Sequence, residues 1–150
     1  MPASPLLRAL LGFIAAALSV LIFHQGMVGA LHALAIPGLE VARTPYNLAP
    51  IPPFGVPALA SLCFWAGLYG AAFGLVAPRL TLPFWLAGLL TGVIAVLVGM
   101  FLVAAIKGNP IAGGWVWNNW VRGLLINGCW GLGLGLIYPM LAPRRRPAPG

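Results

Sequence analysis

Few side chains in this sequence are equipped for chemistry, and most of them stand inside stretches that are otherwise apolar. His24, Gln25 and His32 lie in an early hydrophobic run, Asn127 lies in a late one, and Glu40 is the only acidic residue. Histidine titrates near neutral pH. With Glu40 as its carboxylate partner, this set is one candidate for a site that responds to protons or cations. Polar residues at membrane depth are the first place to look for function.

Three other interpretations of the same residues stay open. His24 with Cys63 and Cys129 is a ligand set suited to a soft metal such as Cu(I) or Zn, although their spacing matches no familiar metal motif. Haem ligation by two histidines would need a second His24 from another copy of the chain. The simplest interpretation is structural, a hydrogen bond between helices from His24 or Gln25 to Asn127. We predict no bound cofactor.

Catalysis and nucleic-acid binding are both disfavoured by the sequence. It contains no pair of carboxylates, no Ser–His–acid set and no Gly-rich phosphate loop, so we predict that the protein is not an enzyme. Its cations are scattered singly apart from three at the C-terminus, and no basic stripe with interleaved aromatic residues is present. We therefore expect no nucleic-acid partner.

The composition indicates which elements must position these side chains. Of 150 residues, 61% are hydrophobic and 6% are charged, whereas soluble domains are about one quarter charged. Charged residues divide the chain into four apolar stretches, each long enough for the roughly 20 residues that a helix needs to cross a bilayer. We predict a single all-α membrane domain, 1–150, with transmembrane helices at 6–35, 56–77, 82–106 and 121–141.

The first helix has an alternative role as a secretory signal. A cleavage-like site, Ala33-Leu34-Ala35, follows its apolar run. The run is at the long end for a signal sequence and the site lies unusually far from the N-terminus, which favours a retained helix.

The distribution of cations predicts the orientation. With four spans, the side that carries both termini collects Arg8, Arg79 and the triplet Arg144, Arg145 and Arg146 of a basic tail, 143–150. The other side has three cations, Arg43, Lys107 and Arg122. Because cytoplasmic loops carry the excess of positive charge, we predict that both termini are cytoplasmic and that the triplet contacts lipid headgroups.

Depth along the helices groups the polar residues. Counting about 1.5 Å per residue predicts that His24, Gln25, Asn127 and the two cysteines share a layer in the outer leaflet, with His32 and Glu40 above it. Tryptophans 115, 117 and 120 should mark the outer headgroup level, and Trp85 and Tyr138 the inner one. The loops 37–57 and 108–120 are expected to anchor at that interface or to lie across the mouth of the bundle above the polar layer.

A repeated string suggests an internal duplication. The segment 67–80 aligns without gaps on 128–141, with three shared glycines and a shared proline, and 12–15 aligns more weakly on 92–95. We predict two helical hairpins that run the same way, as a parallel repeat.

The repeated glycines fall on one face of each helix at 100° per residue. Since small residues allow membrane helices to approach closely, we expect a packing seam rather than a pore lining. We predict that helices 56–77 and 121–141 pack on each other or on a second copy through six glycines, Gly67, Gly70, Gly74, Gly128, Gly131 and Gly135.

The motifs His24-Gln25-Gly26, His32, 44–50 and 53–57 resemble those of a group of small uncharacterised four-helix inner-membrane proteins of proteobacteria. The resemblance covers roughly the first half of the chain. It implies a multi-pass protein of the bacterial inner membrane, and it carries over no activity because none is assigned to the group.

The functional expectation is a structural, accessory or assembly component of that membrane. Its partners would be the lipid bilayer and either a second copy or another membrane protein. The alternative is a small transporter or channel for protons, cations or a soft metal, using His24, Gln25 and Asn127.

Overall fold

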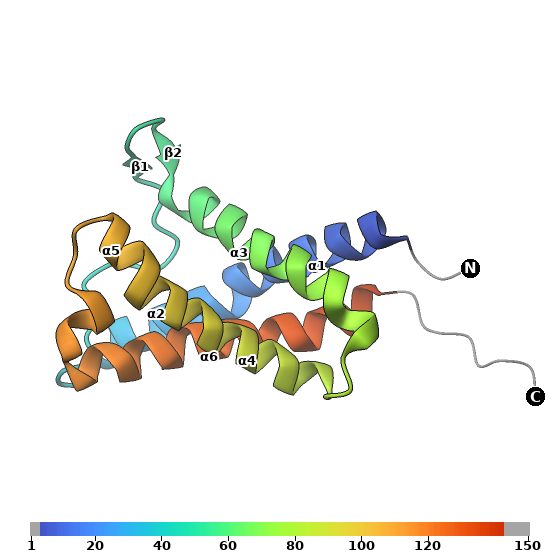
Figure 1. The fold of residues 1–150 in the computed structure, drawn as a ribbon. Helices are drawn as coiled ribbons and strands as arrows, with labels where there is room; N and C mark the ends of the chain where they lie inside the picture. The colour runs from blue at the N-terminus through green and yellow to red at the C-terminus, as the bar shows by residue number, and fades with distance from the viewer. Residues whose placement is uncertain (1–3, 143–150) are drawn as a thin grey trace, which may run out of the picture.

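A computed structural model describes residues 4–142 as a bundle of four long helical segments (Figure 1). The segments Pro5–Leu34, Ala58–Arg79, Phe84–Ile106 and Trp117–Leu141 are each long and apolar enough to cross a membrane. The predicted class, an all-helical chain with four candidate spans, is thereby supported. The fourth segment begins four residues earlier than predicted. The predicted tail, with Arg144, Arg145 and Arg146, lies outside the described residues.

The first segment joins three helical pieces end to end, α1 (Pro5–Ser19), η1 (Val20–His24) and α2 (Gln25–Leu34), of which η1 is a π-helical turn. Ser4 caps the start of α1, because its hydroxyl accepts a hydrogen bond from the Leu7 amide at 3.2 Å. Pro5 occupies the first turn, where the missing amide hydrogen costs nothing. The segment ends at Ala35, whose left-handed φ of 45° stops the helix. The π-helical turn η1, which is wider than an α-helical turn, directly precedes Gln25.

The loop after α2 contains a short antiparallel ribbon, β1 (Pro50–Ile51) paired with β2 (Val56–Pro57), before α3 (Ala58–Val76) and the 3-10 turn η2 (Ala77–Arg79). Proline has no amide hydrogen, which keeps the ladder short. Of the two interpretations of the loop 37–57, the one that lays it across the bundle mouth does not hold for the ribbon. The ribbon projects from the body at the start of α3 (Figure 1), with Phe54 87% exposed.

The second half of the chain is α4 (Phe84–Leu97), the π-helical η3 (Val98–Val103), α5 (Ala104–Ile106), the 3-10 turn η4 (Ile111–Trp115) and α6 (Trp117–Leu141). In η4, Gly113 and Gly114 have φ values of 61° and 68°, which glycine adopts without a steric penalty. The Trp120 indole N–H donates to the Ala112 carbonyl at 2.9 Å. The turn is thus held against the first turn of α6.

In each hairpin, the glycine face of the second helix packs against the first helix of the same hairpin. A Cβ added at Gly70 would collide with the Gly12 carbonyl oxygen and the Ala16 methyl group, so the backbones of α3 and α1 are in direct contact. A Cβ at Gly131 would similarly collide with the Gly88 carbonyl oxygen and would lie 2.8 Å from the Gly92 nitrogen. The prediction that α3 and α6 use these glycines to pack on each other or on a second copy is therefore wrong, because the glycines face α1 and α4 of the same chain.

The reason lies on the facing helices. Close approach needs small residues on both sides of a contact, and α1 and α4 supply them. The nearest backbone contacts in the two hairpins are Gly12 with Gly70 and Gly88 with Gly131, and Gly92 lies close to Gly131 as well. The weak alignment instead paired Gly12 with Gly92. The shift amounts to one helical turn.

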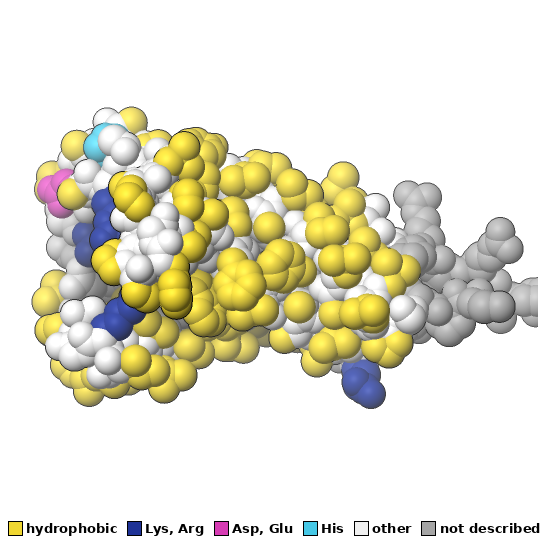
Figure 2. Space-filling model, turned by 90° about the horizontal axis from the view of Figure 1, so that it is seen from above, with side chains coloured by type: hydrophobic (Ala, Val, Ile, Leu, Met, Phe, Trp, Pro, Cys, Tyr) yellow, Lys and Arg dark blue, Asp and Glu magenta, His cyan; other side chains and the backbone are white. Residues whose placement is uncertain are grey.

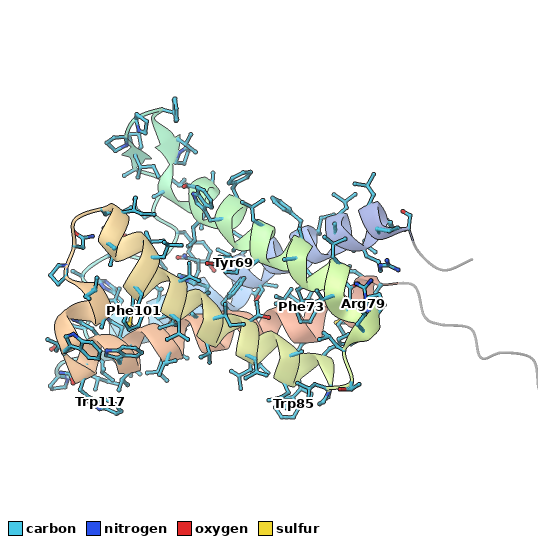
Figure 3. The ribbon with its side chains drawn as sticks, viewed as in Figure 1. Tyr69, Phe73, Arg79, Trp85, Phe101 and Trp117 are labelled. Atoms are coloured by element: carbon cyan, nitrogen blue, oxygen red, sulfur yellow. The ribbon has the colours of Figure 1, made fainter. Side chains whose placement is uncertain are left out.

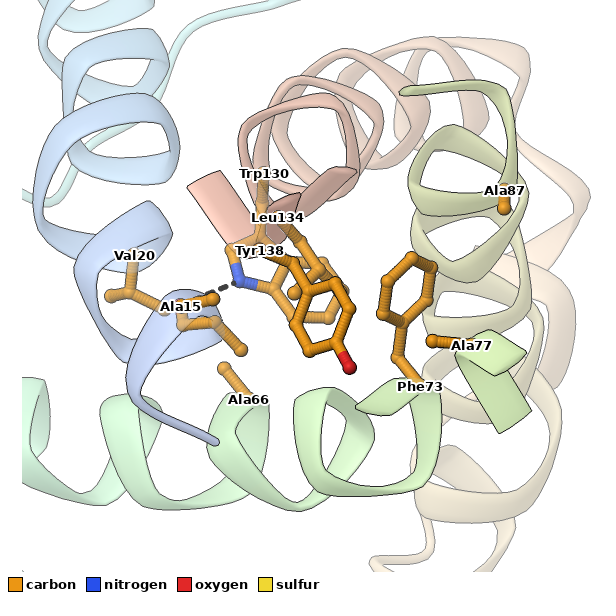
Figure 4. Close-up of a cluster of buried hydrophobic side chains, with 10 residues drawn as sticks. Ala15, Val20, Ala66, Phe73, Ala77, Ala87, Trp130, Leu134 and Tyr138 are labelled. Carbon is orange, nitrogen blue, oxygen red and sulfur yellow. Dashed lines mark hydrogen bonds between the residues drawn. The ribbon is translucent and has the colours of Figure 1, made fainter. Parts of the chain in front are cut away.

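The two hairpins meet along α1 and α6, where α6 buries the side chains Trp130, Leu134 and Tyr138 (Figure 4). The Trp130 indole N–H donates to the Ala16 carbonyl at 3.1 Å, and the Ser19 hydroxyl donates to the Trp130 carbonyl at 2.5 Å. Both bonds cross between the hairpins in the apolar interior, where an unpaired polar group would be costly. They fix α6 against α1.

Tyr138, predicted to mark the inner headgroup level, has its side chain buried in this interior. Its side chain is 2% exposed, and its hydroxyl donates to the Gly74 carbonyl on α3 at 3.4 Å. The ring packs edge-on against Phe73 and Phe84, with ring centroids 5.4 and 5.7 Å away. A tyrosine near a helix end is placed by its neighbours as well as by its depth.

Candidate functional site

The surface separates into an apolar body and a polar end. Figure 2 shows hydrophobic side chains along the body, with acidic, histidine and several basic side chains gathered at the end that carries the loops. Trp117 and Trp85 lie near opposite ends of the bundle, and Arg79 lies near the end of Trp85 (Figure 3). The exposed fractions of the Trp117 and Trp85 side chains, 75% and 48%, suit amphipathic rings at two membrane interfaces. The described charges at the loop end are Glu40, Arg43, Lys107 and Arg122.

A cavity of about 550 Å³ opens at this loop end, between α2, the segment 41–52, the first turns of α3 and the residue that follows α5. We call it the loop-end cavity. Its volume falls within the range of small-molecule sites, about 300–1,000 Å³. Polar and charged side chains in its lining are His24, Gln25, Thr44, Asn47, Ser61, Arg43 and Lys107. Val28, Leu62 and Trp65 contribute apolar wall.

Gln25 organises the floor of the cavity. Its side chain is 6% exposed, and its Oε1 accepts a hydrogen bond from the Tyr46 amide at 2.7 Å. Its Nε2 lies 3.3 Å from Nδ1 of His24. The Tyr46 hydroxyl donates to the Leu21 carbonyl at 2.9 Å, inside the π-helical turn. Two hydrogen bonds thus attach the loop to the first helix beside the cavity, and π-helical turns are frequent at functional sites.

The cations at this end differ in how they are engaged. Arg122 donates to the Glu40 carbonyl at 3.0 Å and to Oδ1 of Asn119 at 2.6 Å. Arg43 and Lys107, which line the cavity, make no side-chain hydrogen bond or ion pair with any residue from 4 to 142. No carboxylate is part of the lining. The cavity is therefore positively charged without compensation from the described chain.

Of the residues predicted from sequence, His24 and Gln25 line the cavity, while His32, Glu40 and Asn127 do not. His32 is exposed, with Nδ1 2.8 Å from the Val41 carbonyl, and Glu40 is exposed at the surface. Asn127 donates to the Gly123 carbonyl of its own helix at 3.0 Å. The expected bond from His24 or Gln25 to Asn127 is not made, because a loop amide and a carbonyl one turn away provide the partners instead.

The soft-metal interpretation is not supported by the geometry. Within residues 4–142, no three His, Cys, Asp or Glu side chains form a group able to hold a metal ion, so His24, Cys63 and Cys129 stay apart. The Cys63 thiol lies 4.0 Å from the Ala17 carbonyl, towards α1. The haem interpretation needs another copy of the chain, and the contacts within one chain do not test it.

Several lining residues had no signal in the sequence. Thr44, Asn47 and Ser61 are ordinary loop and helix residues, and Arg43 and Lys107 appeared only as markers of orientation. Tyr46 meets Gln25 across 21 positions of chain. The proline-rich loop between two spans was the single available hint.

Comparison with protein-family models, curated proteins and solved structures finds no match to this chain.

Proposed function

We propose that this chain is a non-catalytic accessory component of a bacterial inner membrane that holds a ligand in the loop-end cavity. The observation that carries the proposal is the cavity itself, about 550 Å³ in volume and lined by charged, polar and apolar side chains. Mixed linings of this kind fix both the position and the orientation of a small molecule. The two hydrogen bonds of Tyr46 prearrange one wall, which lowers the entropy lost on binding.

Binding without bond-breaking is favoured by the neighbours of His24. The nearest side-chain partner of its ring is the amide of Gln25, at 3.3 Å. A general base is normally oriented by a carboxylate or paired with a nucleophile. The lining has no acidic residue, and neither the Thr44 nor the Ser61 hydroxyl is hydrogen-bonded to the His24 ring, whose partner is Gln25.

The alternative of a transporter or channel has less support. A conducting path needs polar groups that continue from the cavity through the middle of the bundle. In the middle of the described bundle, Leu134 is fully buried, Trp130 is 2% exposed, and the Ser19 hydroxyl donates to a backbone carbonyl. These side chains support a closed core.

The proposal includes an arrangement in the membrane. Both termini would face the cytoplasm, supported by the five-to-three bias of cations, and the resemblance of the first half suggests the inner membrane. The hairpins would be a parallel repeat, supported by the equivalent contacts of Gly70 with Gly12 and of Gly131 with Gly88. Lipid would be the main partner, with a second copy or another membrane protein as a further one.

A variant that fills the cavity tests the proposal. Ser61→Phe places a ring in the lining, and Ala60→Phe, on an exposed position of the same helix outside the lining, is the matched control. Native mass spectrometry of protein released from nanodiscs of bacterial lipid should detect a bound species on the wild type and on the control. We expect occupancy to fall about tenfold in Ser61→Phe, equivalent to about 1.4 kcal/mol. Equal occupancy in the two variants, or a wild type that retains nothing, would contradict the proposal.

A further inference from the structure

The charge of the loop-end cavity favours an anion. Arg43 comes from the loop after α2 and Lys107 from the residue after α5, so two separate parts of the chain each bring a cation to one cavity. Both lack partners within residues 4–142. Glu40, the only acidic residue of the sequence, does not line the cavity. An arginine fork and a lysine ammonium are the two side chains that proteins use most to hold phosphate.

The apolar wall of the same cavity reaches the lipid-facing surface. Trp65 lines the cavity and is 60% exposed on α3, so one side chain belongs to both surfaces. Leu62 and Val28 add to the apolar wall of the cavity. A ligand with its charge near Arg43 and Lys107 can therefore pass an apolar chain along Trp65 into the bilayer.

The volume adds a further constraint. A bare phosphate or a carboxylate would leave most of a cavity of about 550 Å³ to water. An acyl chain would also cover the apolar wall and remove it from water, which is favourable. From charge, shape and volume together, we infer that the loop-end cavity takes the phosphate headgroup of an anionic amphiphile. The inference rests on the proposed function, that this cavity holds a ligand, and it names the chemical class of that ligand.

Nanodiscs of defined composition test the inference with the full chain. One set contains phosphatidylcholine alone, and the other contains phosphatidylcholine with a minor share of phosphatidylglycerol of matched chains. Native mass spectrometry of the released wild type should show phosphatidylglycerol retained about tenfold over its share of the disc. The double variant Arg43→Gln with Lys107→Gln should lose that preference, since two charge-assisted contacts are removed.

Two controls test whether the lost lipid preference comes from the charges in the cavity, and not from misfolding or from a lower net charge. Arg43→Lys with Lys107→Arg keeps both cations and should retain the preference. Arg122→Gln removes a cation at the same end of the molecule but outside the lining, and it should retain the preference as well. Loss of preference in Arg122→Gln to the same extent as in the double variant would overturn the inference.

Further measurements distinguish a lipid phosphate from a free phosphate compound. They also show whether the inference alone fails or the proposed function fails with it. Displacement of phosphatidylglycerol by soluble glycerol phosphate would overturn the amphiphile and assign the cavity to a free phosphate compound. A bound lipid lost in Ser61→Phe but indifferent to headgroup charge would overturn the inference and leave the proposed function standing. A wild type that retains no bound species from any disc would defeat both.

Discussion

Gln25 links the first helix to the loop that forms one wall of the cavity. Because its buried Oε1 accepts from the Tyr46 amide, replacement by the apolar side chain of similar size in Gln25→Leu leaves that amide without its partner. We expect the free energy of unfolding to fall by about 1–3 kcal/mol. Proteolysis within 41–52 should accelerate, as measured by limited digestion in detergent.

His32→Leu is the matched comparison for this prediction. It removes a bond from the same helix to the same loop, at the Val41 carbonyl, but the bond is exposed. Exposed substitutions of this kind usually change stability by less than about 0.5 kcal/mol. If the two variants lost the same stability, the attachment of the loop would not depend on the buried amide.

At the scale of the helices, stability depends on the two glycine contacts. Gly70→Leu and Gly131→Leu each place a side chain where the facing backbone already lies. We expect each to destabilise the bundle by at least about 1–3 kcal/mol, measured by unfolding in mixed SDS micelles. Gly99 in η3 has no neighbour within 4 Å of an added Cβ, so Gly99→Leu should be nearly silent.

Similar small losses for all three glycine variants would mean that the hairpins do not close through these contacts. A loss confined to Gly70→Leu would also be informative. It would make the two hairpins unequal in strength, in spite of their equivalent glycine contacts.

At the scale of the whole molecule, the orientation is testable by labelling. In a background of Cys63→Ala and Cys129→Ala, we expect Phe54→Cys, at the exposed tip of the ribbon, to react with an impermeant maleimide in intact cells. Thr81→Cys, at the exposed turn between α3 and α4, should react only after permeabilisation. The reverse pattern would place the cavity on the cytoplasmic face.

The helical class and the candidate spans followed from the sequence alone, because a chain with 6% charged residues has too little charge for a soluble surface and its charges fall between apolar runs. That glycines mark close contacts also followed from their spacing. The spacing did not show which helices these glycines contact. A glycine leaves one face of a helix open, and the small residues of the facing helix decide what fills it, as Gly12 and Gly88 do.

The candidate site depended still more on the tertiary structure. His24 and Gln25 stood out in the sequence because polar side chains are conspicuous in an apolar run. Arg43, Lys107 and Ser61 did not, since each is ordinary in its own segment and becomes notable only where the loop, α3 and the end of α5 surround one cavity. Composition and spacing determine what each segment can do in a bilayer. The packing of α3 against α1 brings the loop and α3 to the cavity, and the packing of α6 against α1 adds the hairpin that carries Lys107.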